Sequence, residues 1–212
     1  DKKANEFSIA EEIWHAITHG VGLLLSIAGL AILVAYAALQ GSALTVTSSA
    51  IFGATLIIMY GSSTLYHAIT HRKAKRLFQH FYHASIYFLI AGSYTPISLI
   101  TLGGMLGWTI FAINWTTAIF GIYLKFAYQD RFEKLSLILY LIMGWLIVVA
   151  AKPLIAAMEN GGLWLLVAGG LSYTFGIIFY IRDNKLYYHA IWHLFVLAGS
   201  IFHFFMVLIY II

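Results

Sequence analysis

Residues 21–39 read VGLLLSIAGLAILVAYAAL, an uncharged apolar run that is long enough to cross a lipid bilayer as a helix. The run belongs to a longer segment, 13–71, that contains no Asp, Glu, Lys or Arg. Two further uncharged segments occupy 77–124 and 186–212. Of the 212 residues, 62% are hydrophobic and only 9% are charged, whereas soluble domains carry about 25% charged residues. The chain is therefore predicted to be an integral membrane protein.

Turn-forming residues divide these long segments into separate helices. The first segment breaks around LQGSALTVTSS (39–49), and the second breaks at TLGGMLG (101–107), where two adjacent glycines favour a tight turn. The predicted fold is all-α: a polar tail at 1–15 is followed by one membrane domain at 16–212, a bundle of seven transmembrane helices. The predicted spans are 16–38, 46–69, 79–101, 107–127, 135–152, 163–181 and 187–211.

The basic residues predict how the bundle is oriented. With seven spans, all of the 12 Lys and Arg residues except Lys152 fall on the side of the N-terminus. Cytoplasmic loops carry such an excess of positive charge, so the N-terminus is predicted to be cytoplasmic and the C-terminus external. The same asymmetry accounts for the net charge of +4, and no nucleic-acid partner is expected. The chain contains no cysteine, which excludes thiolate metal ligands.

Eight of the nine histidines lie near predicted cytoplasmic helix ends. In HAIWH, His189 and His193 are four residues apart, so both imidazoles face one side of a helix. His67 closes the second span at the same depth. These three histidines would hold a tetrahedral zinc ion and leave one position open to water, although another borderline divalent metal would suit them too. Alternatively, they are interfacial residues that bond to backbone or water without a metal.

The other histidines support weaker predictions. His71 borders the basic sequence RKAKR and is expected to be a solvated loop residue. His80 and His83 could orient the residues that bind a metal, or could simply pack at the interface. His203 lies deeper in the last span and is expected to be a core histidine with a hydrogen-bond partner.

Four motifs, in this order and on these spans, resemble the haemolysin III family. They are EEIWHAITHG (11–20), SSTLYH (62–67), HASIYFLIAGSYTP (83–96) and HAIWH (189–193). The family lies within the wider progestin and adipoQ receptor superfamily, which includes the adiponectin receptors. The resemblance covers nearly the whole chain and implies a multi-pass protein of the bacterial plasma membrane.

The resemblance also implies a metal site and a chemistry. In the superfamily, three histidines hold zinc near the cytoplasmic face, and an aspartate contacts the ion directly or through water. The matching histidines are His67, His189 and His193, and the serine of the S-x-x-x-H signature is Ser63. This chain has Tyr82 at the aspartate position, so a phenol replaces a carboxylate. It also has His15 where the first family motif commonly has Asn.

Two classes of function follow from this resemblance. The first is a zinc-dependent hydrolase of membrane lipid amides such as ceramide, in which Ser63 orients water or the developing oxyanion and Tyr82 impairs the activity. The second is a pore-forming cytolysin or a membrane-homeostasis protein with a structural metal. The spans show no charged lumen, so a pore would require a homo-oligomer. A receptor function is less favoured because the predicted external loops are short.

Overall fold

The computed structural model of the chain describes residues 7–212, and within that range every regular element is a helix. Seven helical segments there are long and apolar enough to cross a membrane, as the sequence predicts. They are α1 (Ile9–Gln40), α2 (Ala43–Ala68), α3 (Arg72–Pro96) with its π-helical extension η1 (Ile97–Leu102), α4 (Gly104–Tyr128), the α5–α6 segment (Glu133–Ala157), α7 (Asn160–Tyr180) and α8 (Tyr188–Tyr210). A short 3₁₀ turn, η2 (Gln129–Phe132), joins α4 to α5.

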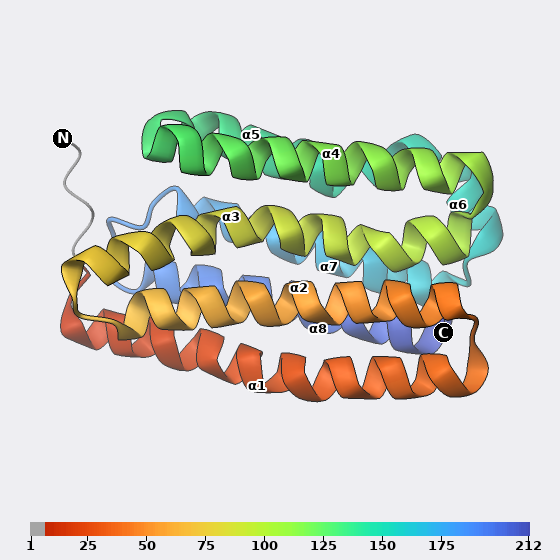
Figure 1. Cartoon of the computed structure of the whole chain (residues 1–212), viewed down its shortest axis with the longest axis horizontal. Helices are drawn as coiled ribbons and strands as arrows, with labels where there is room; N and C mark the ends of the chain where they lie inside the picture. The colour runs from red at the N-terminus through yellow and green to blue at the C-terminus, as the bar shows by residue number, and fades with distance from the viewer. Residues whose placement is uncertain (1–6) are drawn as a thin grey trace.

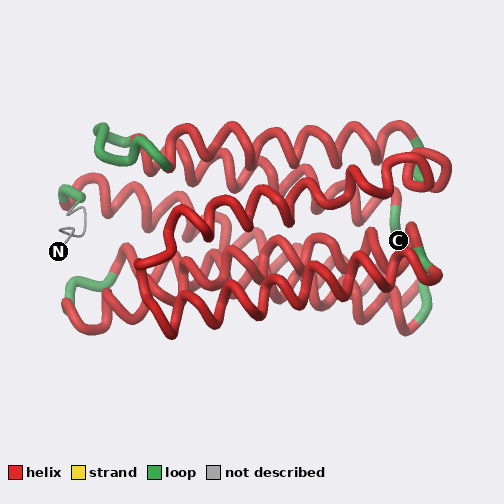
Figure 2. Tube along the Cα trace, turned by 90° about the horizontal axis from the view of Figure 1, so that it is seen from above, coloured by secondary structure: helices red, strands yellow, loops and turns green. Residues whose placement is uncertain are grey.

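The helices lie side by side along one long axis, with short loops at the two ends (Figures 1 and 2). Neighbouring contacts form a closed ring that runs from α1 through α2, α3, α5, α7 and α8 back to α1, while α4 packs on α3 and α5. The start of α1 and the end of α8 lie at opposite ends of the bundle, as an odd number of crossings requires (Figure 1). Which end faces the cytoplasm stays a prediction.

The first helix begins inside the predicted polar tail. Ser8 caps α1 and its hydroxyl accepts a hydrogen bond from the Glu11 backbone N–H, while the Glu11 side chain accepts one from the Ser8 backbone N–H. This reciprocal capping box satisfies two amide groups that a helix start would otherwise leave unpaired. The helix therefore starts at Ile9 rather than at the predicted residue 16, and its first turns bury Glu11 and His15.

The fifth span is also longer than predicted. A 3₁₀ stretch, η3 (Leu146–Ala150), joins α5 (Glu133–Trp145) to α6 (Ala151–Ala157). Pro153 follows this junction and lies in the first turn of α6, where the missing N–H of proline would be unpaired in any case. The span can therefore run through Lys152 and Pro153 to Ala157, although the sequence predicts an end at 152. The predicted turn at Gly103 and Gly104 is confirmed, because both have positive φ (58° and 52°).

Candidate metal centre

One end of the bundle gathers most of the histidines. We call it the histidine end: α1, α3 and α8 begin there, and α2 ends there (left in Figure 1). It brings together His67 from α2 with His189 and His193 from α8, whose ligand atoms all lie within 4.8 Å of one another. All three side chains are buried. The structure therefore brings the three predicted ligands together, and their coordination of a metal stays a prediction.

Hydrogen bonds determine which nitrogen of His67 and His193 is free. His67 Nδ1 lies 2.6 Å from Glu12 Oε2, and a carboxylate only accepts, so Nδ1 carries the proton. The Thr18 hydroxyl donates to the Trp14 carbonyl (2.8 Å) and can therefore only accept from His193 Nδ1 at 3.0 Å. In each neutral ring Nε2 then keeps an unshared electron pair.

These free nitrogens fit a metal ion. Within the described part of the chain, Nε2 of His67, Nε2 of His193 and both nitrogens of His189 are buried without a hydrogen-bond partner. A buried polar atom without a partner costs about 1–3 kcal/mol, so packing alone does not account for several of them in one place. Imidazole nitrogens with a free electron pair are good ligands for zinc and for other borderline divalent metals.

Glu12 supports the cluster from α1. One oxygen of its carboxylate accepts from His67, and the other pairs with Lys75 Nζ at 2.8 Å. Lys75 also donates to the Tyr66 carbonyl (3.0 Å), which joins the start of α3 to the end of α2. A carboxylate behind a metal-binding histidine fixes its tautomer and its ring orientation. Sequence reasoning noted Glu12 only as part of a motif, because its partner lies 55 residues away.

His15 and His19 also belong to this cluster, although the sequence did not identify them as site residues. The His15 ring lies 4.7 Å from that of His67 and 4.8 Å from that of His189, measured between centroids. The His19 ring stacks on His193 at 3.5 Å and 8°, and His19 Nδ1 lies 2.6 Å from Ser63 Oγ. The signal was present in HAITH (15–19), which has the same spacing as HAIWH.

Glu11 joins the starts of α1 and α8. One of its carboxylate oxygens accepts from the Ser8 backbone N–H, and the other accepts from the Tyr187 backbone N–H, both at 3.0 Å. Tyr187 precedes α8 and adopts a left-handed conformation (φ 61°), which is uncommon for a residue with a side chain. This contact holds the start of α8 against α1 and so positions His189.

Comparisons with known proteins agree with this arrangement. A family model described as "Haemolysin-III related" matches residues 7–204. The chain belongs to the haemolysin III family. It is 49% identical over 204 residues to "Hemolysin-3" of Bacillus cereus, an alignment that covers 96% of this chain and 93% of the relative. It is also 49% identical to the "Hemolysin-3 homolog" of Bacillus subtilis (96% of both chains), and 32% identical to the human "Monocyte to macrophage differentiation factor" (73% of this chain, 66% of the relative).

Tyr82 in this haemolysin III chain lies beside the histidines with its hydroxyl already engaged. The side chain is buried, and its hydroxyl accepts a hydrogen bond from Trp192 Nε1 at 3.2 Å. Its ring lies 6.1 Å from that of His67 and 6.3 Å from that of His193. Tyr82 therefore packs against the cluster from the side of α3, where the family pattern has an aspartate.

The remaining histidines of this haemolysin III protein lie outside the cluster. His71 is exposed and caps α3, and His203 is buried with Nε2 3.4 Å from the Leu166 carbonyl, so both predictions are confirmed. His83 contacts the Tyr82 ring (5.5 Å). Neither His80 nor His83 is in a group of potential metal ligands among the described residues. An orienting role for these two stays a prediction.

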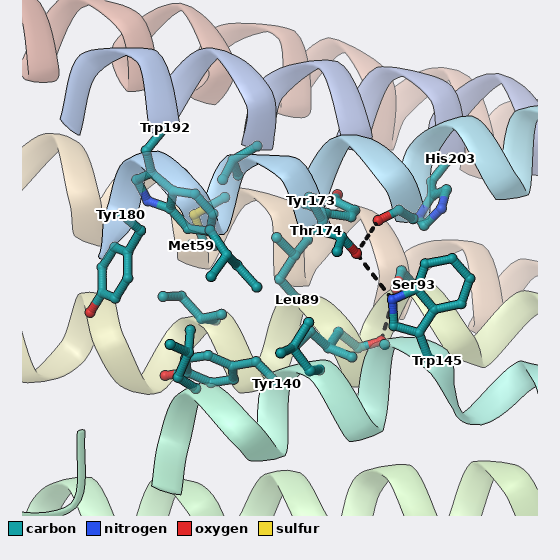
Figure 3. Close-up of a pocket in the computed structure, with 18 of the residues that line it drawn as sticks. Met59, Leu89, Ser93, Tyr140, Trp145, Tyr173, Thr174, Tyr180, Trp192 and His203 are labelled. Atoms are coloured by element: carbon teal, nitrogen blue, oxygen red, sulfur yellow. Dashed lines mark hydrogen bonds between the residues drawn. The ribbon is translucent and has the colours of Figure 1, made fainter. Parts of the chain in front are cut away.

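A largely apolar pocket lies next to the cluster, between α3, α5, α7 and α8. Figure 3 shows Trp192 and Tyr180 at one end of it, and Trp145 and His203 at the other. Tyr82 lines the pocket as well, but His67, His189 and His193 are not among its lining residues. Tyr82, which lines the pocket and contacts the rings of His67 and His193, therefore stands between the two, and Trp192 lines the pocket and bonds its hydroxyl.

Proposed function

We propose that this haemolysin III protein is a metal-dependent hydrolase of membrane lipid amides. The observation that carries the proposal is the convergence of His67, His189 and His193, buried and with free ring nitrogens, beside an apolar pocket. The proposed ion is zinc, and other borderline divalent metals would fit the same nitrogens. Such an ion polarises a carbonyl group and activates water. The proposed partner is a membrane lipid.

Other residues of the chain would prepare this site. Glu12 and Thr18 hold His67 and His193 in the tautomer that presents Nε2. Ser63, bonded to His19, is assigned to orient the attacking water or the oxyanion that develops on the substrate carbonyl. Because Ser63 lies one helical turn before His67, its hydroxyl is on the same side of α2 as the imidazole.

The pocket would bind the acyl chain of the substrate. Its lining is mostly Leu, Ile, Met and aromatic side chains, which suit a hydrocarbon chain. Tyr82 stands between this lining and the histidines and supplies no carboxylate to accept a proton. The chain as written is therefore expected to be a weak hydrolase, and Tyr82→Asp is expected to raise its activity.

Turnover of defined lipids by the purified full chain tests this proposal. The panel would contain ceramides and other N-acyl lipids, with the protein loaded with zinc. We expect Tyr82→Asp to hydrolyse an amide lipid faster than the chain as written. Asn is similar in size to Asp but cannot act as a base, so Tyr82→Asn should not increase the rate of hydrolysis. His193→Ala combined with Tyr82→Asp should abolish the gain. If Tyr82→Asp turns over no lipid in the panel, the hydrolase proposal is overturned.

A second candidate is a membrane-perturbing or membrane-homeostasis protein in which the metal is structural. The position of Tyr82 favours it, because this side chain lies between the pocket and His67 and His193, which do not line the pocket. The name "Hemolysin-3" of the Bacillus cereus relative, and "Hemolysin-3 homolog" of the Bacillus subtilis one, agree with this candidate. Dye release from liposomes distinguishes the candidates. Release that persists after His189 and His193 are both changed to Ala would favour this second function, and loss of release would count against it.

A further inference from the structure

His15 is the most isolated polar side chain at the histidine end. It lies in the second turn of α1 with 0% of its surface exposed. Neither of its ring nitrogens has a hydrogen-bond partner among residues 7–212. The nearest carboxylate oxygen, Glu12 Oε2, is 4.0 Å from Nδ1, which is too far for a hydrogen bond. Burying an imidazole in this way is costly unless something binds it.

The surroundings of His15 are three other imidazoles at nearly equal distances. Four rings around one tetrahedral ion, with metal–nitrogen distances of about 2.1 Å, would have centroids roughly 5 Å apart. The rings of His15, His67, His189 and His193 satisfy this condition pairwise. Their six centroid distances are 4.7 Å (15–67), 4.8 Å (15–189), 5.3 Å (15–193), 5.2 Å (67–189), 5.1 Å (67–193) and 4.7 Å (189–193).

We propose that His15 is a fourth ligand of the metal centre, so that the resting protein holds its ion with four imidazoles. This inference rests on the metal site of the proposed function. His67 shares one group of potential ligand atoms within 4.8 Å with His189 and His193, and another with His15 and Glu12. With the His15 ring turned toward α8, one ion beside His67 would take one free nitrogen from each of the four rings. Packing of the rings without a metal would instead leave all of these nitrogens buried and unpaired.

Two neighbouring residues fit the fourth position less well. Both carboxylate oxygens of Glu12 are engaged, one by His67 and the other by Lys75, so Glu12 acts behind the ligands. The ring of His19 stacks on His193, and His19 Nδ1 is bonded to Ser63. His15 is the buried imidazole with both nitrogens free and with ring contacts to all three predicted ligands.

A fourth protein ligand would leave no open position on the ion for the proposed chemistry. Structural zinc sites have four protein ligands, whereas catalytic sites keep one position open for water or substrate. With His15 bound, the resting centre of this chain is closed. Phe7, whose ring lies 4.7 Å from His15 and 4.9 Å from His189, covers the same side of the cluster. Hydrolysis would then require His15 to leave the ion, so His15 would inhibit the site from within the chain.

Cobalt substitution of the purified full chain tests the ligand directly. Because the chain has no cysteine, His15→Cys introduces the only thiol. We expect this variant to bind Co²⁺ and to show a new sulfur-to-cobalt charge-transfer band in the near ultraviolet. The matched control, His203→Cys, places a thiol at a buried histidine outside the cluster and should show no such band. X-ray absorption of the zinc-loaded chain as written should fit four imidazoles.

A second variant, His15→Asn, tests the inference even if His15→Cys does not fold. His15→Asn should lose one imidazole from the fitted shell and bind metal at least about tenfold more weakly, a loss that even supporting residues of metal sites can cause. The inference is overturned if His15→Asn keeps the same spectrum and affinity, or if His15→Cys shows no sulfur band while it binds cobalt. A centre of four imidazoles with no lipid turnover in any variant would refute the hydrolase and support the fourth ligand.

Discussion

The two ends of the bundle are built in different ways. At the histidine end, polar side chains connect helices that are distant in sequence: Glu12 reaches His67, Thr18 reaches His193, and Glu11 reaches the start of α8. At the opposite end, the turns are held by local bonds. Ser42 and Thr45 cap α2 reciprocally, and the Gly103 N–H bonds the Ser98 carbonyl at 3.0 Å.

This difference distinguishes contacts that build a binding site from contacts that only stabilise helix ends. Local caps and glycine turns stabilise a helix end whatever lies beside it. Long-range polar bonds between buried side chains instead impose one arrangement on four helices, and they do so around nitrogens that are left free. The histidine end therefore has the features of a binding site, and the opposite end has those of a set of simple turns. Perturbations at the two ends should accordingly have different effects.

Removal of the metal should have the largest effect on the histidine end. An ion present at 100 times its Kd stabilises the folded state by about 2.7 kcal/mol. We expect a chelator to lower the melting temperature of the zinc-loaded protein in detergent, and His67→Ala to melt at the same temperature with or without chelator. His203→Ala, the control, should keep the sensitivity. Equal chelator sensitivity of His67→Ala and the chain as written would contradict a site at the histidine end.

Loss of the carboxylate behind His67 should have the next largest effect. Glu12→Gln keeps the size of the side chain but removes the charge that holds His67 Nδ1–H and Lys75. We expect metal affinity to fall about 10- to 100-fold, as for other supporting residues of metal sites. Competition with a chelator of known affinity measures this loss. Glu133→Gln, at the exposed start of α5, should leave the affinity unchanged. An equal loss in both variants would indicate a general effect of charge.

Loss of the bonds at the starts of α1 and α8 should mainly lower the free energy of unfolding, with a smaller effect on metal affinity. Ser8→Ala removes one cap and should cost about 1 kcal/mol of the free energy of unfolding. Glu11→Ala removes the bonds to both Ser8 and Tyr187, so we expect it to cost about twice as much. Thermal unfolding of the two variants gives the comparison. Equal losses would mean that the contact to Tyr187 contributes nothing to the fold.

The same contrast explains what could be predicted from the sequence. Apolar length, breaking residues and charge asymmetry report on single helices, so all seven spans and the Gly103–Gly104 turn were predicted. The grouping of His67, His189 and His193 followed because depth in the membrane can be counted along each helix. The sequence does not show in the same way which face of each helix contacts its neighbours. Glu12, His15 and His19 were therefore missed, and the bond between Tyr82 and Trp192 could not be anticipated.

At the opposite end, a glycine substitution should have the smallest effect on the metal centre, because it changes only stability. Gly103 combines a φ of 58° with a ψ of −166°, a region almost confined to glycine, and this conformation costs an L-residue about 1–3 kcal/mol. Gly103→Ala should therefore lower the free energy of unfolding by about that amount without changing metal affinity. Gly144→Ala is a matched control, because Gly144 lies in helix α5 and an added Cβ there meets nothing within 4 Å. We expect it to be neutral or slightly stabilising, since alanine favours helix more than glycine does. A loss of metal affinity in Gly103→Ala would show that the two ends are coupled through α3, and it would remove the distinction drawn between them.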